Sequence, residues 1–303
     1  MNPRFDDLYM HFRGLGVTVR RDELLSSHTS FGLGGTADLW VEPESVEMLS
    51  LVLKEARAHN VPITLLGGGT NILFPDDGYR GIILSTLGLI RFSAEEEVVT
   101  ALAGVPLSRI VSLSLRIGLA GLAELTGIPG SVGGAVRGNA GAYGSSIGTV
   151  LDEINVCDSA GISRWIKRSE CGFDYRYCDI PHDHVITGIR CVLKYGDPVK
   201  IQKIAREILH DRLKKQPLGE RSAGSIFKNP PGESAGRILD DEGLKGFRVG
   251  GARISERHAN WIIVDETATA RDVVELIDTA RRKVYEDRRI LLETELVIVE
   301  PKP

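Results

Sequence analysis

The chain of 303 residues lacks the features that mark several large classes of protein. No apolar run approaches the roughly 20 residues that a membrane-spanning helix needs. The formal net charge is −4, so no basic field favours nucleic acid as a partner. Residues 1–14, MNPRFDDLYMHFRG, contain acids and no apolar core. We therefore expect no signal peptide, a cytoplasmic protein, and neither a membrane nor a nucleic acid as partner.

Cysteine is scarce, and it occurs only at Cys157, Cys171, Cys178 and Cys191. None of the four forms a CxxC pair, and a reducing cytosol disfavours disulfides. His182 and His184 lie near Cys178, which raises zinc as an alternative, but the spacing fits no common structural zinc site. We expect four free thiols in and around strands, and no bound metal.

Three common signatures are missing or incomplete. No glycine loop is followed by Gly-Lys-Ser/Thr, so no P-loop is present, and there is no G-x-S-x-G elbow. Residues 32–37, GLGGTA, match G-x-G-x-x-A literally. In a dinucleotide-binding fold this motif opens a helix, whereas the strand-like run DLWV (38–41) follows it here. We expect no classical NAD(P) site at this position.

Two glycine-rich loops are the most informative segments that are present. LTGIPGSVGGAVRGNA (125–140) holds five glycines within twelve residues, and GGGTN (67–71) ends the apolar run 61–66. Glycine and proline at this density disfavour a helix or a strand, and they leave backbone N–H groups bare for contact with phosphate. A single turn needs one glycine with positive φ, not three in a row. The two loops therefore predict one ligand held from two sides.

Length and periodicity predict three domains, at residues 1–85, 86–198 and 199–303. In the first, a helix is expected at 45–59 and strands at 37–41, 63–66 and 81–84. In the second, we expect a helix from Pro106 to Gly118, a hairpin of 153–158 with 163–167, and strands at 98–103 and 185–195. In the third, helices are expected at 199–215, 233–242 and 269–288, and strands at 260–264 and 295–299. The inner face of the helix at 199–215 is expected to carry Ile201, Ile204, Ala205, Ile208 and Leu209.

Three polar segments offer catalytic groups. In SAGSIFKNP (222–230), small residues expose Ser225 as a possible proton donor, although a surface turn is the alternative. In FDYRY (173–177), Arg176 could bind a carboxylate at two points, unless it pairs with Asp174 under the aromatic rings. Alternation in LLETELVIV (291–299) places Glu293 and Glu295 on one face. Most such acids are solvated, and one buried beside a ligand would be a candidate acid.

In this order along nearly the whole chain, these segments resemble the UDP-N-acetylenolpyruvoylglucosamine reductase family. The resemblance is carried by HTSFGLGGTADLWVEP (28–43), LLGGGTNIL (65–73), GIPGSVGGAVRGNAGAYG (127–144), FDYRY, SAGSIFKNP, LKGFRVGGARISERHANWI (244–262) and ETEL (293–296). It implies an α+β protein with an FAD-binding fold of the PCMH type, in which two α/β subdomains clasp FAD, and a third α+β domain that binds substrate.

The resemblance also implies a reaction. NADPH would reduce FAD, and the reduced flavin would pass hydride to the enolpyruvyl group of UDP-N-acetylglucosamine enolpyruvate, giving the peptidoglycan precursor UDP-N-acetylmuramate. Arg176 would stabilise the charge that develops on the carboxylate, Ser225 would protonate carbon, and a protonated Glu295 would assist. A well-placed donor of this kind contributes roughly 3–4 kcal/mol.

Binding residues follow from the same resemblance. FAD contacts are expected from Leu66, Gly67, Gly68, Gly69, Thr70, Asn71, Ile128, Pro129, Gly130, Ser131, Gly133, Gly134 and Asn139. Substrate contacts are expected from Tyr175, Lys215, Gln216, Lys228, Asn229 and Lys245. Only YCDIPHDH (177–184) separates Arg176 from Val185, so the chain resembles the branch of the family without a longer insertion there. The resemblance assigns no role to Arg137.

Two alternatives stay open. An oxidase of alcohols or sugars could use the same flavin fold, but SAGSIFKNP and ETEL do not belong to it, and many such oxidases tether flavin through histidine or cysteine. A non-catalytic module could bind FAD without turnover, although the combination of Arg176, Ser225 and Glu295 argues against it.

Overall fold

The computed structural model describes residues 3–300, which form two compact units. The first unit contains the described residues up to Glu23 together with Asp38–Gly68 and Gly81–His210. The second contains Leu24–Ala37, Gly69–Arg80 and the described residues from Asp211 onward. The three-domain division stays a prediction. None of the helices within residues 3–300 combines the length and apolar character needed to span a bilayer.

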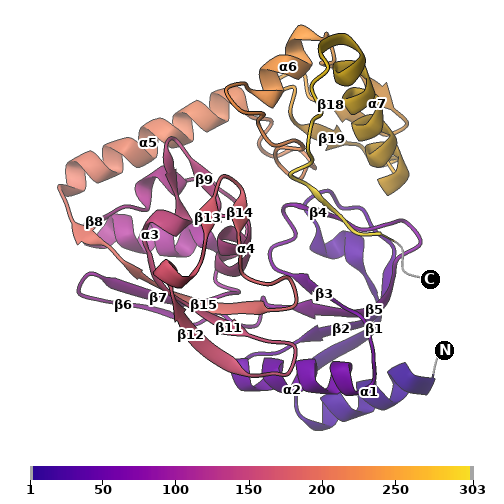
Figure 1. Cartoon of the computed structure of the whole chain (residues 1–303), viewed down its shortest axis with the longest axis vertical. Coiled ribbons are helices and arrows are strands. Elements are labelled where there is room, and N and C mark those ends of the chain that lie inside the picture. Colours follow the sequence, from indigo (N-terminus) through magenta and orange to yellow (C-terminus); the bar gives the residue numbers. More distant parts are fainter. Residues whose placement is uncertain (1–2, 301–303) are drawn as a thin grey trace. The chain divides into compact units, whose positions relative to one another are not determined.

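The first sheet of the first unit has four strands in the order β1-β2-β5-β3 (Figure 1). These are β1 (Thr18–Leu24), β2 (Thr36–Glu42), β3 (Ile63–Leu66) and β5 (Tyr79–Ser85). Helices α1 (Pro3–Gly14) and α2 (Val46–Ala58) pack against the sheet through one apolar cluster. Ser45 caps α2 by accepting the Met48 amide at 3.2 Å. The helix at 45–59 and the three strands are confirmed, although only Leu66 of β3 is fully buried.

The second sheet of this unit has five strands in the order β12-β11-β15-β7-β6. They are β6 (Phe92–Glu95), β7 (Val98–Leu102), β11 (Leu151–Cys157), β12 (Ser163–Lys167) and β15 (Val185–Val192). The predicted hairpin is β11 with β12, in which Glu153 lies opposite Lys167. The expected strand at 185–195 was too long. Strand β15 ends at Val192, and the separate strand β16 (Lys194–Tyr195) pairs with β8 (Leu119–Ala120).

Helices α3 (Leu107–Ile117) and α4 (Val132–Arg137) share the core of the five-stranded sheet. Helix α3 ends at Gly118, as predicted, and this glycine adopts the left-handed conformation. The expectation that the stretch 125–140 forms no helix was wrong, because α4 lies inside it. The helix forms because Ser131 accepts the Gly134 amide and because Gly133 fits tightly against Ala103, where a Cβ atom would approach to 2.8 Å.

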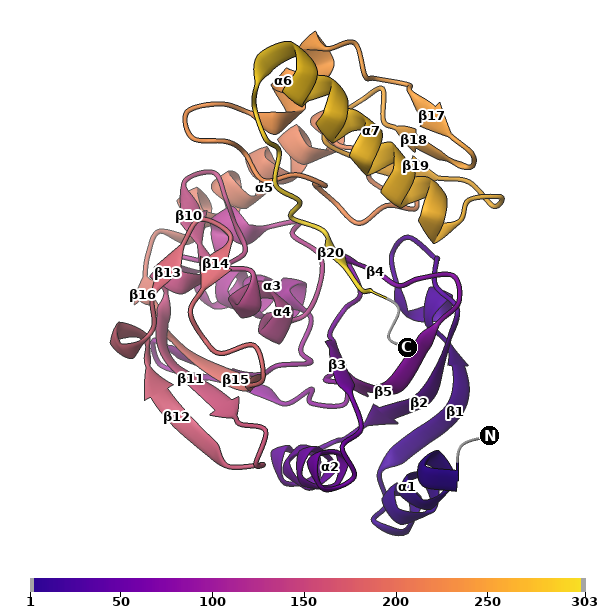
Figure 2. The same cartoon turned by 45° about the vertical axis from the view of Figure 1, so that its right-hand side comes forward.

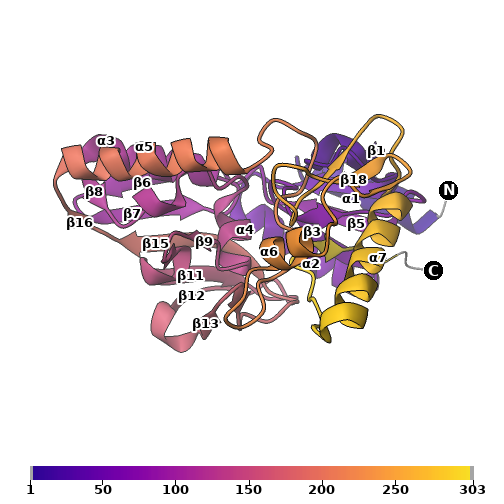
Figure 3. The ribbon, with the colours of Figure 1, turned by 90° about the horizontal axis from the view of Figure 1, so that it is seen from above.

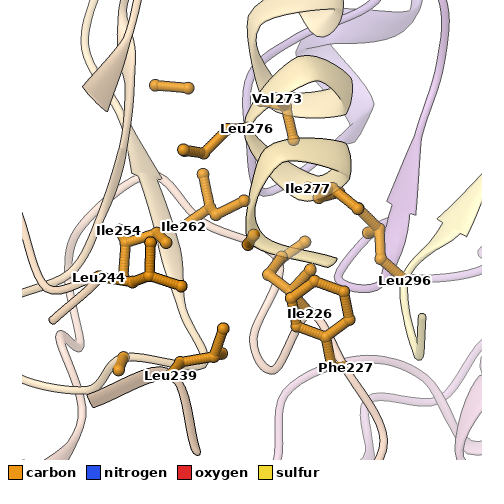
Figure 4. Close-up of a cluster of buried hydrophobic side chains, with 14 of the residues drawn as sticks. Ile226, Phe227, Leu239, Leu244, Ile254, Ile262, Val273, Leu276, Ile277 and Leu296 are labelled. Carbon is orange, nitrogen blue, oxygen red and sulfur yellow. The ribbon is translucent and has the colours of Figure 1, made fainter. Parts of the chain in front are cut away.

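The second unit contains a three-stranded sheet, β17 (Arg248–Val249), β18 (Ala252–Ile254) and β19 (Ile262–Val264), with helices α6 (Ala235–Asp241) and α7 (Ala270–Arg288). Figure 4 shows its core, where Val273, Leu276 and Ile277 of α7 gather with apolar side chains of the sheet and of residues 226–227. The predicted last strand is reduced to β20 (Val297–Ile298), which pairs in parallel with β4 (Ile72–Leu73) (Figure 2).

Helix α5 (Pro198–Lys215) is a single uninterrupted rod (Figure 3). Its buried residues are Ile201, Ala205, Ile208 and Arg212. Ile204 and Leu209 were expected to face inward, but they are 37% and 42% exposed. The buried positions follow a spacing of four, three and four residues, which defines one narrow stripe of a helix, and Ile204 and Leu209 flank it.

Candidate active site

The two glycine-rich loops meet in the first unit. Gly67 and Gly68 leave the end of β3, and a Cβ atom on Gly67 would lie 2.4 Å from the Ser131 Oγ. A Cβ atom on Gly68 would lie 2.8 Å from the Gly130 Cα. Side chains at these positions would therefore force the loops apart. The contact gives two bare stretches of backbone side by side, as a ligand shared by both loops requires.

Gly134 is exposed, and the packing of the protein does not require a glycine at this position. Apart from its chain neighbours and its own helix backbone, the one described atom within 4 Å of an added Cβ is the Ser131 Oγ at 3.6 Å, which is an ordinary contact. Glycine within a helix costs about 1 kcal/mol relative to alanine. The protein keeps glycine here despite this cost in helix stability, which is expected if a ligand approaches the backbone of α4. The residues present are therefore compatible with bound FAD.

The amides at the start of α4 are already engaged. Val132 donates to the Val105 carbonyl at 2.8 Å, and Gly133 donates to the Ala103 carbonyl at 2.9 Å. The Gly134 amide donates to Ser131 Oγ at 3.4 Å. Of residues 132–134, only Gly134 is both small and exposed enough for a cofactor to approach, and amide donors to a phosphate must come from elsewhere in the loops. Before α4, Ile128 is half-buried and Pro129 exposed.

Asn139 is buried and uses its side chain within the protein. Its Nδ2 donates to the Asp174 carbonyl at 2.8 Å, and its Oδ1 accepts the Gly148 amide at 3.1 Å. The residue therefore joins the end of the glycine-rich stretch to the segment that carries Arg176.

The rest of the GGGTN loop belongs to the second unit. Gly69 has φ +63°, and a Cβ there would meet the His28 carbonyl at 1.9 Å, so only glycine fits. Thr70 is half-buried. Asn71 donates from Nδ2 to the Glu295 carbonyl at 3.0 Å, and its backbone carbonyl accepts the Val297 amide at 3.1 Å. The loop thus holds the backbone of the acid that the sequence singled out.

The G-x-G-x-x-A match at 32–37 does not open a helix. A strand follows the motif, as expected, and it begins at Thr36, within the motif itself, so the arrangement is not that of a dinucleotide-binding turn. Gly35 is needed for packing, because a Cβ there would lie 2.2 Å from the Asp76 carbonyl.

Arg176 lies at the turn of a small hairpin in the first unit. The strands are β13 (Phe173–Asp174) and β14 (Tyr177–Cys178). Arg176 adopts φ +53°, a left-handed conformation that non-glycine residues rarely adopt. Its Nη1 donates to the Gly141 carbonyl at 3.2 Å, and its guanidinium lies 5.3 Å from the centre of the Tyr175 ring. Arg176 is half-buried, and Tyr175 beside it is 48% exposed.

Ser225 and Glu295 lie on neighbouring backbone segments of the second unit. The Glu295 amide donates to the Ile226 carbonyl at 2.7 Å, and Phe227 forms a bridge with Thr294. On the other side, Ser225 forms a bridge with Trp261. Residues 225–228 therefore run between two other segments, and Ser225 directly precedes Ile226, whose carbonyl receives the Glu295 amide. Both Ser225 and Glu295 are half-buried.

Asn260 holds this arrangement, and the sequence did not single it out. It is 4% exposed, its Oδ1 accepts the Phe227 amide at 2.9 Å, and its Nδ2 donates to the Phe227 carbonyl at 2.8 Å. The Asn260 side chain thus bonds both backbone groups of Phe227, as a neighbouring strand would do. Its position within HANWI, next to an apolar run, was the available signal.

The other predicted substrate residues of the second unit all have protein partners. Lys228 pairs with Glu293 at 3.3 Å, Lys245 with Asp240 at 2.6 Å, and Lys215 with Asp211 at 2.8 Å. The Asn229 Oδ1 accepts the Ala235 amide at the start of α6, and the Gln216 Oε1 accepts Arg212 Nη1 at 3.3 Å. Lys228 and Asn229 continue the segment of Ser225, whereas Lys215 and Gln216 lie at the end of α5.

The four cysteines are buried and unbonded to one another, as predicted. Burial raises the pKa of the Cys191 thiol to about 12 and raises the pKa of the other three. Within residues 3–300, no three His, Cys, Asp or Glu side chains come together as metal ligands would.

The chain is similar to proteins of one family over nearly its whole length. Residues 216–299 match the model of the C-terminal domain of UDP-N-acetylenolpyruvoylglucosamine reductase, and residues 37–166 match that of an FAD binding domain. A UDP-N-acetylenolpyruvoylglucosamine reductase of Syntrophus aciditrophicus is 42% identical over 283 residues, covering 92% of this chain and 91% of that one. One from Clostridium tetani is 36% identical over 282 residues, covering 93% and 92%.

The crystal structure of such a reductase from Thermus caldophilus matches with a TM-score of 0.80 and 36% identity, over 94% of this chain and 100% of that one. The predicted fold class is confirmed: the chain is α+β, with an FAD-binding domain of the PCMH type followed by the matched C-terminal domain.

Proposed function

Because the chain belongs to the UDP-N-acetylenolpyruvoylglucosamine reductase family, we propose that it reduces the enolpyruvyl group of UDP-N-acetylglucosamine enolpyruvate with NADPH. The product would be UDP-N-acetylmuramate, made in the cytoplasm as a precursor of peptidoglycan. The membership itself makes the chain an oxidoreductase with an FAD-binding domain. The observation that carries the proposal is the pairing of the Ser225 segment with the Glu295 segment.

We propose that FAD lies against the bare backbone of Gly67, Gly68 and Gly134 and the loop at 128–131. When bound, it would supply two-electron chemistry, accepting hydride from NADPH and delivering it to the substrate. The side chains of the protein would then hold the substrate and stabilise the negative charge that hydride delivery creates.

Arg176 is proposed to stabilise this negative charge. Hydride addition to the terminal methylene carbon leaves negative charge at the adjacent carbon, which spreads into the carboxylate. A guanidinium presents two N–H groups to a carboxylate in a fixed fork. Because Arg176 is held at the hairpin turn by its bond to Gly141, it needs little reorganisation to stabilise this charge.

Ser225 is proposed to complete the reduction by giving its proton to the same adjacent carbon. A hydroxyl performs this step only from a defined position, and the bonds of Ile226 and Phe227 to neighbouring segments supply it. Glu295, which we propose to be protonated, would donate a hydrogen bond to the substrate carboxylate as negative charge builds up on it. Tyr175, Lys215, Gln216, Lys228, Asn229 and Lys245 are proposed to contact the substrate.

Anaerobic stopped-flow absorbance of the flavin tests the proposal in two half-reactions. NADPH should bleach the wild-type enzyme, and UDP-N-acetylglucosamine enolpyruvate should restore the colour. Ser225→Ala should leave the bleaching within about twofold and slow the return of colour by about 10²–10⁴-fold, the range for a lost proton donor. Glu295→Gln, which replaces the carboxylic acid by a weaker amide donor, should also spare the bleaching and slow the return of colour. Glu266→Gln, at an exposed glutamate of the second unit away from the Ser225 and Glu295 segments, is the control and should match the wild type.

Equal loss of both half-reactions in Ser225→Ala would contradict the proton-donor role. If flavin is bound, but NADPH does not reduce it and the substrate does not reoxidise it, the protein would instead be a binding module without turnover.

A further inference from the structure

Arg137, the last residue of α4, ties this helix to the short connection that follows the Arg176 hairpin. Its Nη1 donates to the Ile180 carbonyl at 2.6 Å and to the Pro181 carbonyl at 3.3 Å, and its Nη2 donates to the His184 carbonyl. In return, Cys178 Sγ donates to the Arg137 carbonyl at 3.3 Å. One guanidinium therefore gathers three carbonyl oxygens from residues 180–184, a task that needs its several N–H donors.

The hairpin that carries Arg176 depends on such anchors. Its strands β13 and β14 have two residues each, and an isolated two-stranded hairpin is at best marginally stable in water. Strand β14 lies beside α4 (Figures 1 and 2). Arg137 holds the β14 side, Asn139 holds the β13 side through the Asp174 carbonyl, and the Gly141 carbonyl receives Arg176 itself. Residues 137–141 thus supply an anchor on each side of the turn.

The Arg137 head group is partly shielded from water. Burial lowers the pKa of its guanidinium below the ordinary value, while the neighbouring Cys178 and Asp183 act in the opposite direction. A side chain at 137 without this fork would leave the carbonyls of Ile180, Pro181 and His184 without these donors. The bonds to the Ile180 and His184 carbonyls are partly buried, so these two groups would need water in place of the guanidinium, which favours an outward shift of the connection.

We propose that Arg137 is a positioning residue for Arg176, linking the glycine-rich loop to the arginine that meets the substrate carboxylate. This role rests on the proposed function of Arg176. The φ of +53° at Arg176 persists only while its surroundings hold it. Once the connection moves, the turn relaxes and the guanidinium shifts. A displacement of about 1 Å at a catalytic group can cost on the order of 100-fold in rate.

The test uses the FAD-loaded full chain with Arg137→Ala, Arg137→Lys and a matched control, Arg116→Ala, which removes an exposed arginine from α3. Hydrogen exchange should accelerate in residues 171–180 of Arg137→Ala and stay unchanged in β11 and β15. Reduction by NADPH should stay within about twofold, while reoxidation by substrate should slow by about 10–100-fold. Arg137→Lys, which has no guanidinium fork, should fall between Arg137→Ala and the wild type.

Chemical rescue separates positioning from general damage. Millimolar guanidinium should occupy the space left in Arg137→Ala and restore part of its reoxidation rate, whereas it should not restore Ser225→Ala. If Arg137→Ala does not load FAD, Arg137→Lys carries the same three measurements.

Unchanged exchange in residues 171–180, reoxidation equal to the wild type, or equal loss in both half-reactions would overturn the positioning role. A wild-type enzyme that substrate cannot reoxidise would overturn the proposed function instead, so the two failures are distinguishable.

Discussion

Gly133 and Gly134 are adjacent in α4 but are glycine for different reasons. A Cβ on Gly133 would press on Ala103 at 2.8 Å, so packing requires glycine there. A Cβ on Gly134 would meet only Ser131 Oγ at 3.6 Å, so packing does not. The pair therefore separates what the fold needs from what the proposed cofactor needs.

Gly134→Ala should raise the unfolding free energy of the FAD-free protein by up to about 1 kcal/mol, because alanine favours a helix. It should weaken FAD binding by about tenfold or more, because a methyl group would intrude on a ligand lying against α4. Gly133→Ala should instead destabilise the FAD-free protein by about 1–3 kcal/mol. Urea unfolding and fluorescence titration with FAD measure both effects. Unchanged FAD affinity in Gly134→Ala would mean that the cofactor does not touch this residue.

At the scale of elements, α7 has an unusually well-satisfied start. The Ala270 amide donates to Asp76 Oδ1 at 2.8 Å, and the Arg271 amide donates to Asp76 Oδ2 at 3.2 Å. Thr269 and Asp272 form a capping box that accepts the next amide. The usual orphan donors of a helix start thus find side chains, one of them 194 positions away.

Asp76→Ala should therefore lower the free energy of unfolding by about 1–2 kcal/mol, the cost of losing a helix cap. Asp77→Ala removes the neighbouring exposed carboxylate and is the matched control, expected within about 0.5 kcal/mol of the wild type. Urea unfolding followed by circular dichroism makes the measurement. Equal stability of the two variants would show that Asp76 contributes nothing to α7.

The whole molecule combines an FAD-binding domain with a C-terminal domain, and the C-terminal unit recruits residues from the first third of the chain. Leu24–Ala37 and Gly69–Arg80 belong to it, and Arg221 donates to the Phe31 and Gly32 carbonyls at 3.0 and 2.9 Å. The GGGTN loop is consequently divided, with Gly67 and Gly68 in one unit and Gly69 onward in the other.

Acid precipitation of the whole protein should leave yellow FAD in the supernatant. A covalent tether through cysteine needs a thiolate, and burial raises the pKa of all four thiols, which keeps them protonated. The absorbance of the supernatant makes the measurement, and adding FAD back to the stripped protein should restore activity. Flavin that stays with the pellet would favour the alternative of a flavin-tethering oxidase.

Much of the secondary structure was predictable because burial patterns are local. The helix at 45–59 has its cap and its apolar face within its own residues, and the hairpin of β11 and β12 needs only its own turn. The glycine loops, Ser225 and Glu295 stood out because few residue types can perform the tasks that we propose for them. Helix α4 was missed because its stability comes from Ser131 and the contact with Ala103, which composition does not reveal.

Sequence alone thus determined the family resemblance and the fold class, and it supplied the residues that we propose do the chemistry. Tertiary structure decided which of them meet: Asn71 with the Glu295 backbone across 224 positions, Asn260 with Phe227 across 33, and Arg137 with the end of the Arg176 hairpin. The physical reason is that side-chain chemistry and periodicity are properties of short segments. A hydrogen bond between distant residues exists only once the chain has brought its donor to its acceptor.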